Sequence, residues 1–317
     1  MLSRSGAGEL MLLLALYGAV AHAQDYPNKP IRIVTSEPGG GSDLTARVLA
    51  QGMAAGLKQS LVVENRPSNI LGGMVARALP DGYTLLLSGG SFMIGPLLQK
   101  SAYDVVRDFA PITLAATAPN VLVVHASLPA KSVQELVALA RAKPGQLNYA
   151  STAAGGISHL AAELLKSMAG INILRVPYKG TGQAANDLLS GQVQIMFLAI
   201  GTAEPHVKTG KLTALAVTSA TPSALAPGLP TVAASGLPGY EAGIMFGLYA
   251  PAKTPVSIVT RLNVEAVQVL HRAEVKEKLL NAGVEVVGGR AQEFAAAIKS
   301  ELARTNKVIK DAGIRED

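Results

Sequence analysis

The stretch Ile31–Leu57, IRIVTSEPGGGSDLTARVLAQGMAAGL, predicts a strand, a glycine-rich loop and a helix in direct succession. Its opening residues 31–36 are mostly apolar and β-branched, as in a buried strand. Three glycines at 39–41 follow, and residues 44–57 then repeat apolar side chains with helical spacing. Ser42 stands where a helix N-cap is expected. This order of elements is typical of a parallel sheet covered by helices.

The same unit occurs a second time in Leu147–Ile171, LNYASTAAGGISHLAAELLKSMAGI. Further strand-like and helix-like runs alternate around both copies, so an α/β chain with two similar lobes is expected. The Pro- and Gly-rich segment Leu225–Gly243 is the best candidate for a crossover back to the first lobe. We therefore expect lobe 1 to comprise residues 24–122 plus 244–317. Lobe 2, with the crossover segment, is expected to comprise residues 123–243.

The N-terminal residues have the pattern of a secretory signal peptide. Arg4 precedes an apolar run, Leu10–Ala21, which leads into the small-residue site Ala21-His22-Ala23. The run is shorter than the ~20 apolar residues that span a bilayer, which disfavours the alternative of a membrane anchor. We expect residues 1–23 to be removed and the protein to reside in the periplasm. The absence of Cys from the sequence excludes a lipid-modified cysteine and any disulfide.

The composition of the 317-residue chain is that of a globular protein, with 49% hydrophobic and 16% charged residues. The formal net charge is +6, but Lys and Arg are scattered along the sequence, whereas nucleic-acid or membrane-binding patches are clustered. Aromatic residues make up only 4%, fewer than base-stacking proteins need. We expect no nucleic-acid partner and a mild preference for anionic small molecules.

The loop SEPGGGSD (36–43) is suited to bind an anion. Unpaired N–H groups and the helix dipole give a helix N-terminus partial positive charge, and glycines allow close approach. Phosphate is disfavoured because Leu44 stands where the dinucleotide fingerprint needs Gly, and because Asp43 would repel a polyanion. A small carboxylate fits better. The alternative is a plain turn in which Asp43 stabilises the start of the helix.

The second loop, STAAGGIS (151–158), also carries hydroxyls and glycines before a helix. Two such loops from two lobes could close on one ligand. The turn Tyr178-Lys179-Gly180 follows a strand, and its Lys could supply a counter-charge and its Tyr an amphipathic wall. The alternative for this turn is a plain surface position.

Catalytic and metal-binding patterns are weak. The chain has no G-x-S-x-G elbow, no H-E-x-x-H and no Cys ligand set, so we expect no metal, no cofactor and no enzyme activity. The pair Ser158 and His159 is the only candidate nucleophile and base, and we interpret His159 as a capping or packing residue. A secreted α/β hydrolase remains the alternative from a different class.

Several further motifs occur together in order, and they cover nearly the whole chain after residue 23. They are YPNKPIRIV (26–34), GGGSD (39–43), VVENRP (62–67), PDGYTLL (80–86), SHLAAELLKSMAGI (158–171), VPYKGTGQAANDLLSGQVQIMF (176–197) and LPTVAASGLPGYEA (229–242). With them the sequence resembles the Bug/TctC-type periplasmic solute-binding proteins, the receptors of tripartite tricarboxylate transporters.

This resemblance implies a two-lobed periplasmic-binding-protein (Venus-flytrap) fold, each lobe a sheet flanked by helices. It also implies a small organic acid ligand, membrane permease subunits as partners and a monomeric receptor. A ligand sensor for a membrane signalling protein is the alternative. By position, the resemblance and the loop chemistry assign ligand binding to Gly39, Gly40, Gly41, Ser42, Asp43, Ser88, Gly89, Ser91, Ser151, Thr152, Ala153, Ala154, Gly155, Ser158, Tyr178, Lys179, Gly180 and Ala199.

The sequence departs from the family pattern at three places. Ser36-Glu37 replace an aromatic residue and Pro before the glycines, and the loop SNILGG (68–73) is short. Leu198-Ala199 stand where a polar pair is common. The last change removes polar partners and suggests a less polar monocarboxylate as the ligand.

Overall fold

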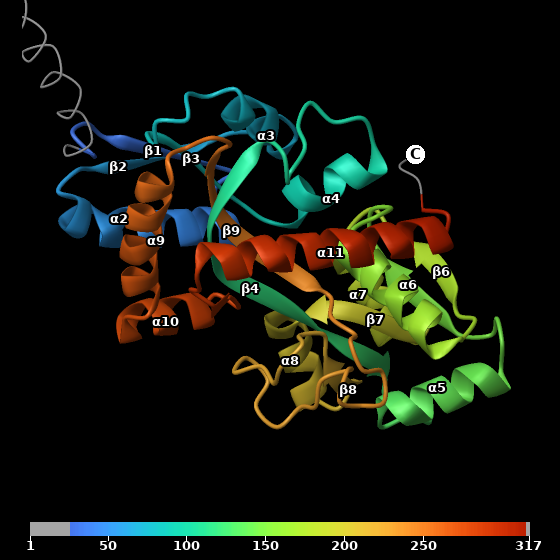
Figure 1. Cartoon of the computed structure of the whole chain (residues 1–317). Coiled ribbons are helices and arrows are strands. Elements are labelled where there is room, and N and C mark those ends of the chain that lie inside the picture. The colour runs from blue at the N-terminus through green and yellow to red at the C-terminus, as the bar shows by residue number, and fades with distance from the viewer. Residues whose placement is uncertain (1–25, 315–317) are drawn as a thin grey trace, which may run out of the picture.

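The computed structural model describes residues 26–314, and its strands form two sets that share the long strand β4 (Phe109–His125) (Figure 1). The first lobe contains β2 (Leu61–Asn65), β1 (Ile31–Thr35), β3 (Thr84–Ser88), β9 (Gly243–Pro251) and β4, in that order. β1 pairs in parallel with β2 and β3, and β9 runs antiparallel to β3 and β4. The short β10 (Glu285–Val286) also pairs with β4.

The second lobe continues from β4 through β7 (Ile195–Ala199) and β5 (Asn148–Ser151) to β6 (Leu174–Pro177). β5 is parallel to both β6 and β7, whereas β7 is antiparallel to β4. β8 (Leu212–Val217) also pairs antiparallel with β4. The parallel pairs predicted from the repeated unit are therefore present in both lobes.

β4 changes partners within its length. Residues 109–119 pair with β9, and residues 120–125 pair with β7 and β8. At the change, the Asn120 N–H donates to Thr218 Oγ1 at 2.8 Å, and the Ala242 N–H donates to the Thr218 carbonyl at 2.9 Å. The expected boundary between the lobes, at 122/123, lies inside the continuous strand β4. The lobe boundaries given above stay a prediction. The hydrogen bonds at Thr218 tie together three chain segments at the place where the lobes meet.

The helices cover the faces of the two sheets. The first lobe has α2 (Gly41–Leu57), α3 (Ser68–Ala76), α4 (Gly90–Leu98), α9 (Val256–Leu270) and α10 (Ala273–Leu280). The second lobe has α5 (Val133–Ala142), α6 (Ile157–Ala169), α7 (Thr181–Leu189) and α8 (Ile200–Lys208).

α11 (Ala291–Asp311) lies across both lobes in Figure 1. Its residues Phe294 and Ile298 pack into the first-lobe core, while Val308 and Ile309 pack into the second-lobe core. The last helix therefore contacts both lobes, although the expected boundaries place it in lobe 1 alone. Because an amphipathic helix gains stability from burying its apolar face, these contacts give the lobes a third connection besides β4 and β9.

Local sequence signals were partly wrong. Gly40, rather than Ser42, is the N-cap of α2, and Ser42 is the second residue of the helix. α4 was not predicted at all, because its sequence is short and contains Pro96.

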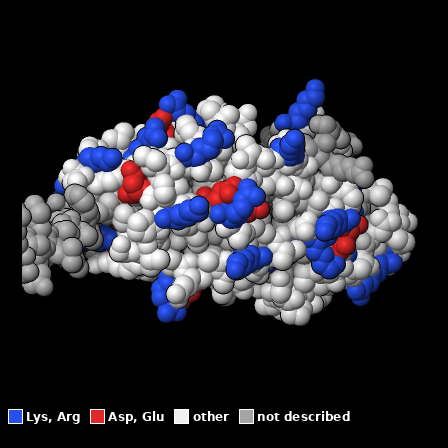
Figure 2. Space-filling view, turned by 45° about the horizontal axis from the view of Figure 1, so that its top comes forward, with Lys and Arg blue, Asp and Glu red and all other residues white. Residues whose placement is uncertain are grey.

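Two expectations concern features outside this architecture. The signal peptide at 1–23 lies outside the described residues, among which no helix is long and apolar enough to cross a membrane. On the face drawn in Figure 2, Lys and Arg are dispersed, several of them beside an Asp or Glu, and they do not merge into one basic patch. That face carries no sign of a clustered nucleic-acid surface.

Candidate functional site

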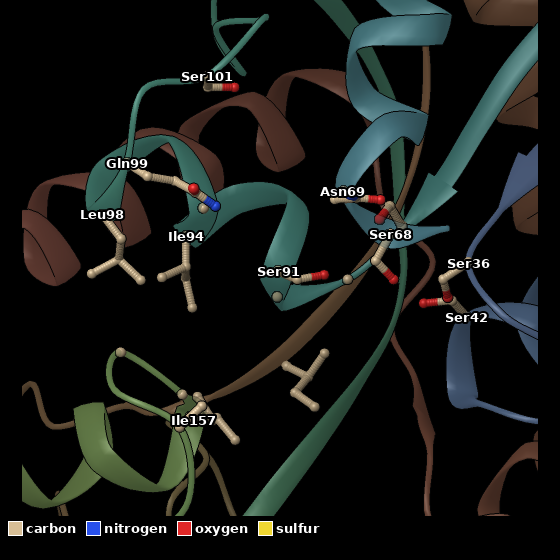
Figure 3. A pocket seen from close by; sticks show the side chains of 18 of the residues that line it. Ser36, Ser42, Ser68, Asn69, Ser91, Ile94, Leu98, Gln99, Ser101 and Ile157 are labelled. Carbon is tan, nitrogen blue, oxygen red and sulfur yellow. The ribbon is translucent and has the colours of Figure 1, made fainter. Parts of the chain in front are cut away.

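A cleft of about 850 Å³ lies between the loops of the two lobes (Figure 3). The first lobe lines it with residues that follow β1 and β3 and that begin α3, together with α4 and the loop after it. The second lobe contributes the loop 153–157, and β9 contributes Ile244 and Phe246. Ligand sites are concave and mostly apolar, with a few polar groups that fix orientation, and this cleft has that character.

Two glycines bring the starts of α2 and α4 onto one aromatic ring. A Cβ atom on Gly41 would lie 2.6 Å from Phe246 Cζ, and one on Gly89 would lie 3.1 Å from the same ring. Real Cβ atoms essentially never approach as closely as at Gly41, and the distance at Gly89 is tighter than most real Cβ contacts, so both positions favour glycine. The close packing places the N-terminal ends of the two helices next to each other over Phe246.

These helix ends offer unsatisfied donors to the cleft. The N-caps Gly40 and Gly89 cannot supply a side chain, and neither helix has a side-chain cap. Ser42 and Ser88 are 7% and 2% exposed, and both line the cleft. Neither hydroxyl has a hydrogen-bond partner within residues 26–314. Free backbone donors at two helix ends, together with two hydroxyls that line the cleft, indicate a site for a polar, electron-rich guest.

Asp43 supports the first-lobe loop from behind and does not line the cleft. Its carboxylate accepts hydrogen bonds from the Gly39 N–H at 3.1 Å, from Arg47 Nε at 3.1 Å and from Asn65 Nδ2 at 2.8 Å. Burial raises the pKa of Asp43, but the hydrogen bonds from Arg47, Asn65 and Gly39 outweigh it and bring the pKa below its ordinary value. Asn65 also donates to the Ser36 carbonyl at 2.6 Å, which fixes the start of the loop.

Glu37, one of the unusual residues in the sequence, acts at the start of α3. Its carboxylate accepts hydrogen bonds from the Ser68 N–H at 3.0 Å and the Ser68 hydroxyl at 2.6 Å. The Ser68 hydroxyl bond, followed by backbone N–H groups, lowers the pKa of Glu37. Glu37 thus satisfies the N-terminus of α3 and holds Ser68 and Asn69 at the cleft, where both are lining residues.

The second-lobe loop is held by Arg175. Its Nε donates to Ser151 Oγ at 2.7 Å, and its Nη2 donates to the Thr152 carbonyl at 2.8 Å. Ser151 is fully buried, so its hydroxyl is used inside the lobe. What faces the cleft is the next stretch, residues 153–157. Gly155 contacts Leu98 of α4 there, because a Cβ atom on Gly155 would lie 2.3 Å from Leu98 Cδ1.

His159 supports the same loop and is not paired with a nucleophile. Its Nδ1 accepts the Gly155 N–H at 3.1 Å, and its Nε2 lies 4.0 Å from Glu163 Oε1. Glu163 also accepts hydrogen bonds from Tyr149 and from Lys166 Nζ. Burial, followed by the positive charge of Arg175, lowers the pKa of His159 to about 4. The imidazole is therefore neutral near pH 7 and acts as a packing residue.

The structure gathers part of the predicted site at the cleft. The lining includes Ser42, Ser88, Gly89, Ser91, Ala153, Ala154 and Gly155. The other predicted residues lie outside that lining: Gly39, Gly40, Gly41, Asp43, Ser151, Thr152, Ser158, Tyr178, Lys179, Gly180 and Ala199. Tyr178 donates its hydroxyl to Asp187 within its own lobe at 2.8 Å.

Sequence reasoning missed most of the cleft wall. Ile94, Leu98 and Lys100 come from α4 and the loop after it, and Phe246 comes from β9. The signal for α4 was present in its apolar composition but was masked by Pro96. Phe246 carries no local signal, because its role depends on the pairing of β9 with β3 and β4.

The chain belongs to the tripartite tricarboxylate transporter family of receptors (TctC), whose family model matches residues 45–314. It is 36% identical over 290 residues to the UPF0065 protein in the tcbD–tcbE intergenic region of Pseudomonas sp. strain P51, covering 90% of this chain and 86% of that protein. It is 33% identical over 315 residues to protein BugT of Bordetella pertussis, covering 96% of each chain.

Solved structures agree in fold. R. palustris Rpa4515 with adipate is 35% identical with a TM-score of 0.70, covering 92% of this chain and 99% of that one. A TctC solute-binding protein from Polaromonas without ligand is 25% identical with a TM-score of 0.82, covering 90% and 99%. The two-lobed fold expected from the sequence is therefore confirmed.

Proposed function

We propose that this protein is a periplasmic receptor that binds a small organic carboxylate in the cleft. It delivers that ligand to the membrane subunits of a tripartite tricarboxylate-type transporter. The observation that carries the proposal is the pair of hydroxyls of Ser42 and Ser88, which line the cleft at two uncapped helix N-termini and have no hydrogen-bond partner within residues 26–314. Membership of the receptor family and the adipate bound by the R. palustris relative support the same assignment.

The chemistry of the site favours a carboxylate over a neutral ligand. Helix N-termini and hydroxyl donors stabilise negative charge, and no Asp or Glu is among the lining residues of the described chain. The carbon chain of the ligand would lie along Ile94, Leu98 and Ile244. Charge-assisted hydrogen bonds are about twice as strong as neutral ones, so the anionic end would dominate orientation.

Closure of the lobes would complete the site. The unliganded Polaromonas protein has the higher TM-score at lower identity, and the adipate-bound relative has the lower TM-score at higher identity. This order of TM-scores is expected if the lobes of the present structure are open, as in an unliganded receptor. Rotation of one lobe against the other lowers the TM-score although neither lobe changes. We propose that the hydrogen bonds at Thr218 lie at the hinge. Rotation there would bring Lys179 and its neighbours Tyr178 and Gly180 towards the ligand.

The same site supports capture without chemical conversion. His159, the candidate base from the sequence, is buried and its Nδ1 is engaged by the Gly155 amide. A ligand incubated with the protein should therefore be recovered unchanged, as NMR of the filtrate would establish. We further propose that the mature receptor acts as a monomer in the periplasm, as the signal-peptide pattern and the family support.

Thermal-shift measurements with matched ligands test the proposal. Linear acids of four to eight carbons should raise the melting temperature on the order of 5 °C at saturating concentration, because ligand binding stabilises the folded state. The primary amides of the same acids should give no shift. Equal stabilisation by the amides would contradict the carboxylate assignment. Ser167→Ala, an exposed position on α6, serves as a control for general effects of serine removal.

A further inference from the structure

Lys100 is the one charged side chain among the cleft-lining residues of the described chain. It is exposed, and it makes no ion pair with any residue in 26–314. It comes just after the C-cap of α4, Gln99, in a segment whose neighbours Gln99 and Ser101 also line the cleft. A cation that faces a ligand cleft without a partner within the protein is available for the ligand.

Lys100 and the proposed carboxylate site at Ser42 and Ser88 lie at different ends of the cleft. Figure 3 shows Ser36 and Ser42 on one side and Leu98 and Gln99 on the other. Lys100 follows Gln99 directly in the chain, so it belongs to the second side. The lining residues in between include apolar side chains, Ile94 and Ile157 among them. A ligand anchored at Ser42 would therefore extend along an apolar wall towards Lys100.

The opposite rim carries negative charge. Glu37 is exposed beside Ser36 and holds Ser68, and both of these serines line the cleft. A second anionic group would be repelled at that rim and attracted at Lys100. Solvent and salt weaken each of these interactions, yet both favour the same orientation of the ligand. The charge pattern thus defines a direction along the cleft.

A simpler role for Lys100 is to complement the carboxyl end of α4. A cation near a helix C-terminus stabilises the helix, and α4 is a short helix that contains Pro96. That role would affect stability and would not distinguish between ligands. Ligand discrimination is therefore the property that separates the two roles.

We propose that Lys100 determines specificity by pairing with a second anionic group at the far end of the ligand, whose carbon chain is unsubstituted and apolar. This inference rests on the proposed function, since it assumes a first carboxylate at Ser42 and Ser88. It departs from the sequence-based expectation of a monocarboxylate, because the residues that suggested it, Leu198 and Ala199, do not line the cleft. The simplest ligand of this kind is a linear α,ω-dicarboxylate.

Calorimetric titration with two acid series tests the proposal. The probes are the linear dicarboxylates and the linear monocarboxylates of four to eight carbons, with malate as a hydroxylated short diacid. The wild-type protein should bind its best diacid about tenfold more tightly than the monoacid of equal length, as a charge-assisted contact implies. Lys100→Gln should abolish that preference, and Lys100→Arg should retain most of it. Lys276→Gln, on the exposed face of α10, should leave it unchanged.

The outcomes separate this inference from the proposed function. If monoacids bind as well as diacids, or if the preference survives in Lys100→Gln, then Lys100 is not the selecting residue while the carboxylate receptor stands. If malate binds more tightly than every unsubstituted diacid, the apolar-chain part of the inference is overturned. If no acid of either series binds, the proposed function itself fails, and the inference fails with it.

Discussion

The first-lobe loop, 36–43, presents Ser36 and Ser42 to the cleft, whereas the second-lobe loop, 151–158, turns its Ser151 hydroxyl into the lobe. Asp43, a carboxylate within the first loop, braces that loop. The second is braced by Arg175 from β6 and by a neutral imidazole. Two segments with the same order of strand, glycine-rich loop and helix thus contribute different groups to the cleft. The first presents hydroxyl groups to the cleft, and the second lines the cleft with its backbone and with apolar side chains.

The largest contrast between the loops should be seen in acid. The pKa of His159 falls from 6.5 to about 4 on folding, so the unfolded chain binds more protons between these values. The contribution of neutral His159 to the free energy of unfolding is therefore complete above pH 6.5. It should decrease by about 3 kcal/mol as the pH falls to 4. Urea unfolding at a series of pH values measures this.

His159→Gln should remove most of that pH dependence, whereas His206→Gln, a helix-surface control on α8, should not. An identical pH profile in the wild type and His159→Gln would show that the second-lobe loop is not held by a neutral imidazole.

The next effect concerns the glycines of the first loop. Gly41→Ala would place a methyl group 2.6 Å from Phe246, and overpacking of this kind costs about 2 kcal/mol of stability. It should also weaken acid binding, because it separates α2 from α4. Gly40→Ala is a matched control, since nothing lies within 4 Å of its Cβ position. Thermal unfolding and calorimetry of both variants measure the difference. If Gly40→Ala proved as harmful as Gly41→Ala, the close approach to Phe246 would not be the reason for the glycines.

Removal of Arg175 should loosen the second loop alone. Arg175→Met leaves the Ser151 hydroxyl and the Thr152 carbonyl without their partner, at a cost of about 1–2 kcal/mol. The pKa of His159 should also rise, because the charge of Arg175 helps to lower it. NMR titration of the His159 ring gives that pKa. Arg272→Met, an exposed position before α10, is the control, and an unchanged His159 pKa in Arg175→Met would contradict the proposed bracing.

The smallest effect is expected at Asp43. Its pKa is lowered on folding, so its contribution is present above the unfolded value of about 4 and is lost as the pH falls through the folded value. Asp43→Asn should cost about 1 kcal/mol at pH 7 and flatten the unfolding profile only below pH 4. The first loop is thus acid-sensitive in a lower pH range than the second. A change between pH 6.5 and 4 in Asp43→Asn would contradict this separation.

Much of the fold was accessible from the sequence, because apolar runs and glycine-rich turns are local signals. The strand at Ile31 and the repeated strand, loop and helix unit are examples. The family resemblance extended this to the two-lobed arrangement. The continuous strand β4 and the bridging helix α11 were not foreseen, since both depend on contacts between distant segments.

The candidate site was harder to predict because sequence similarity does not specify the direction of side chains. The hydroxyls of Ser42 and Ser151 occupy comparable loops, yet only Ser42 lines the cleft. Lys179, which could supply a counter-charge, lies outside the cleft lining of this structure, whereas Lys100 lies within it. The cleft wall was missed because α4, the helix that forms it, contains Pro96 and was therefore not predicted as a helix.

Calorimetric titration of the Ser42→Ala/Ser88→Ala double variant tests the central claim most directly. The probe is the linear four- to eight-carbon acid that stabilises the wild-type protein most. Loss of two hydroxyl donors to a carboxylate should weaken binding roughly 10- to 100-fold while Ser167→Ala binds normally. Unchanged affinity in the double variant would show that the carboxylate is not held at the N-termini of α2 and α4.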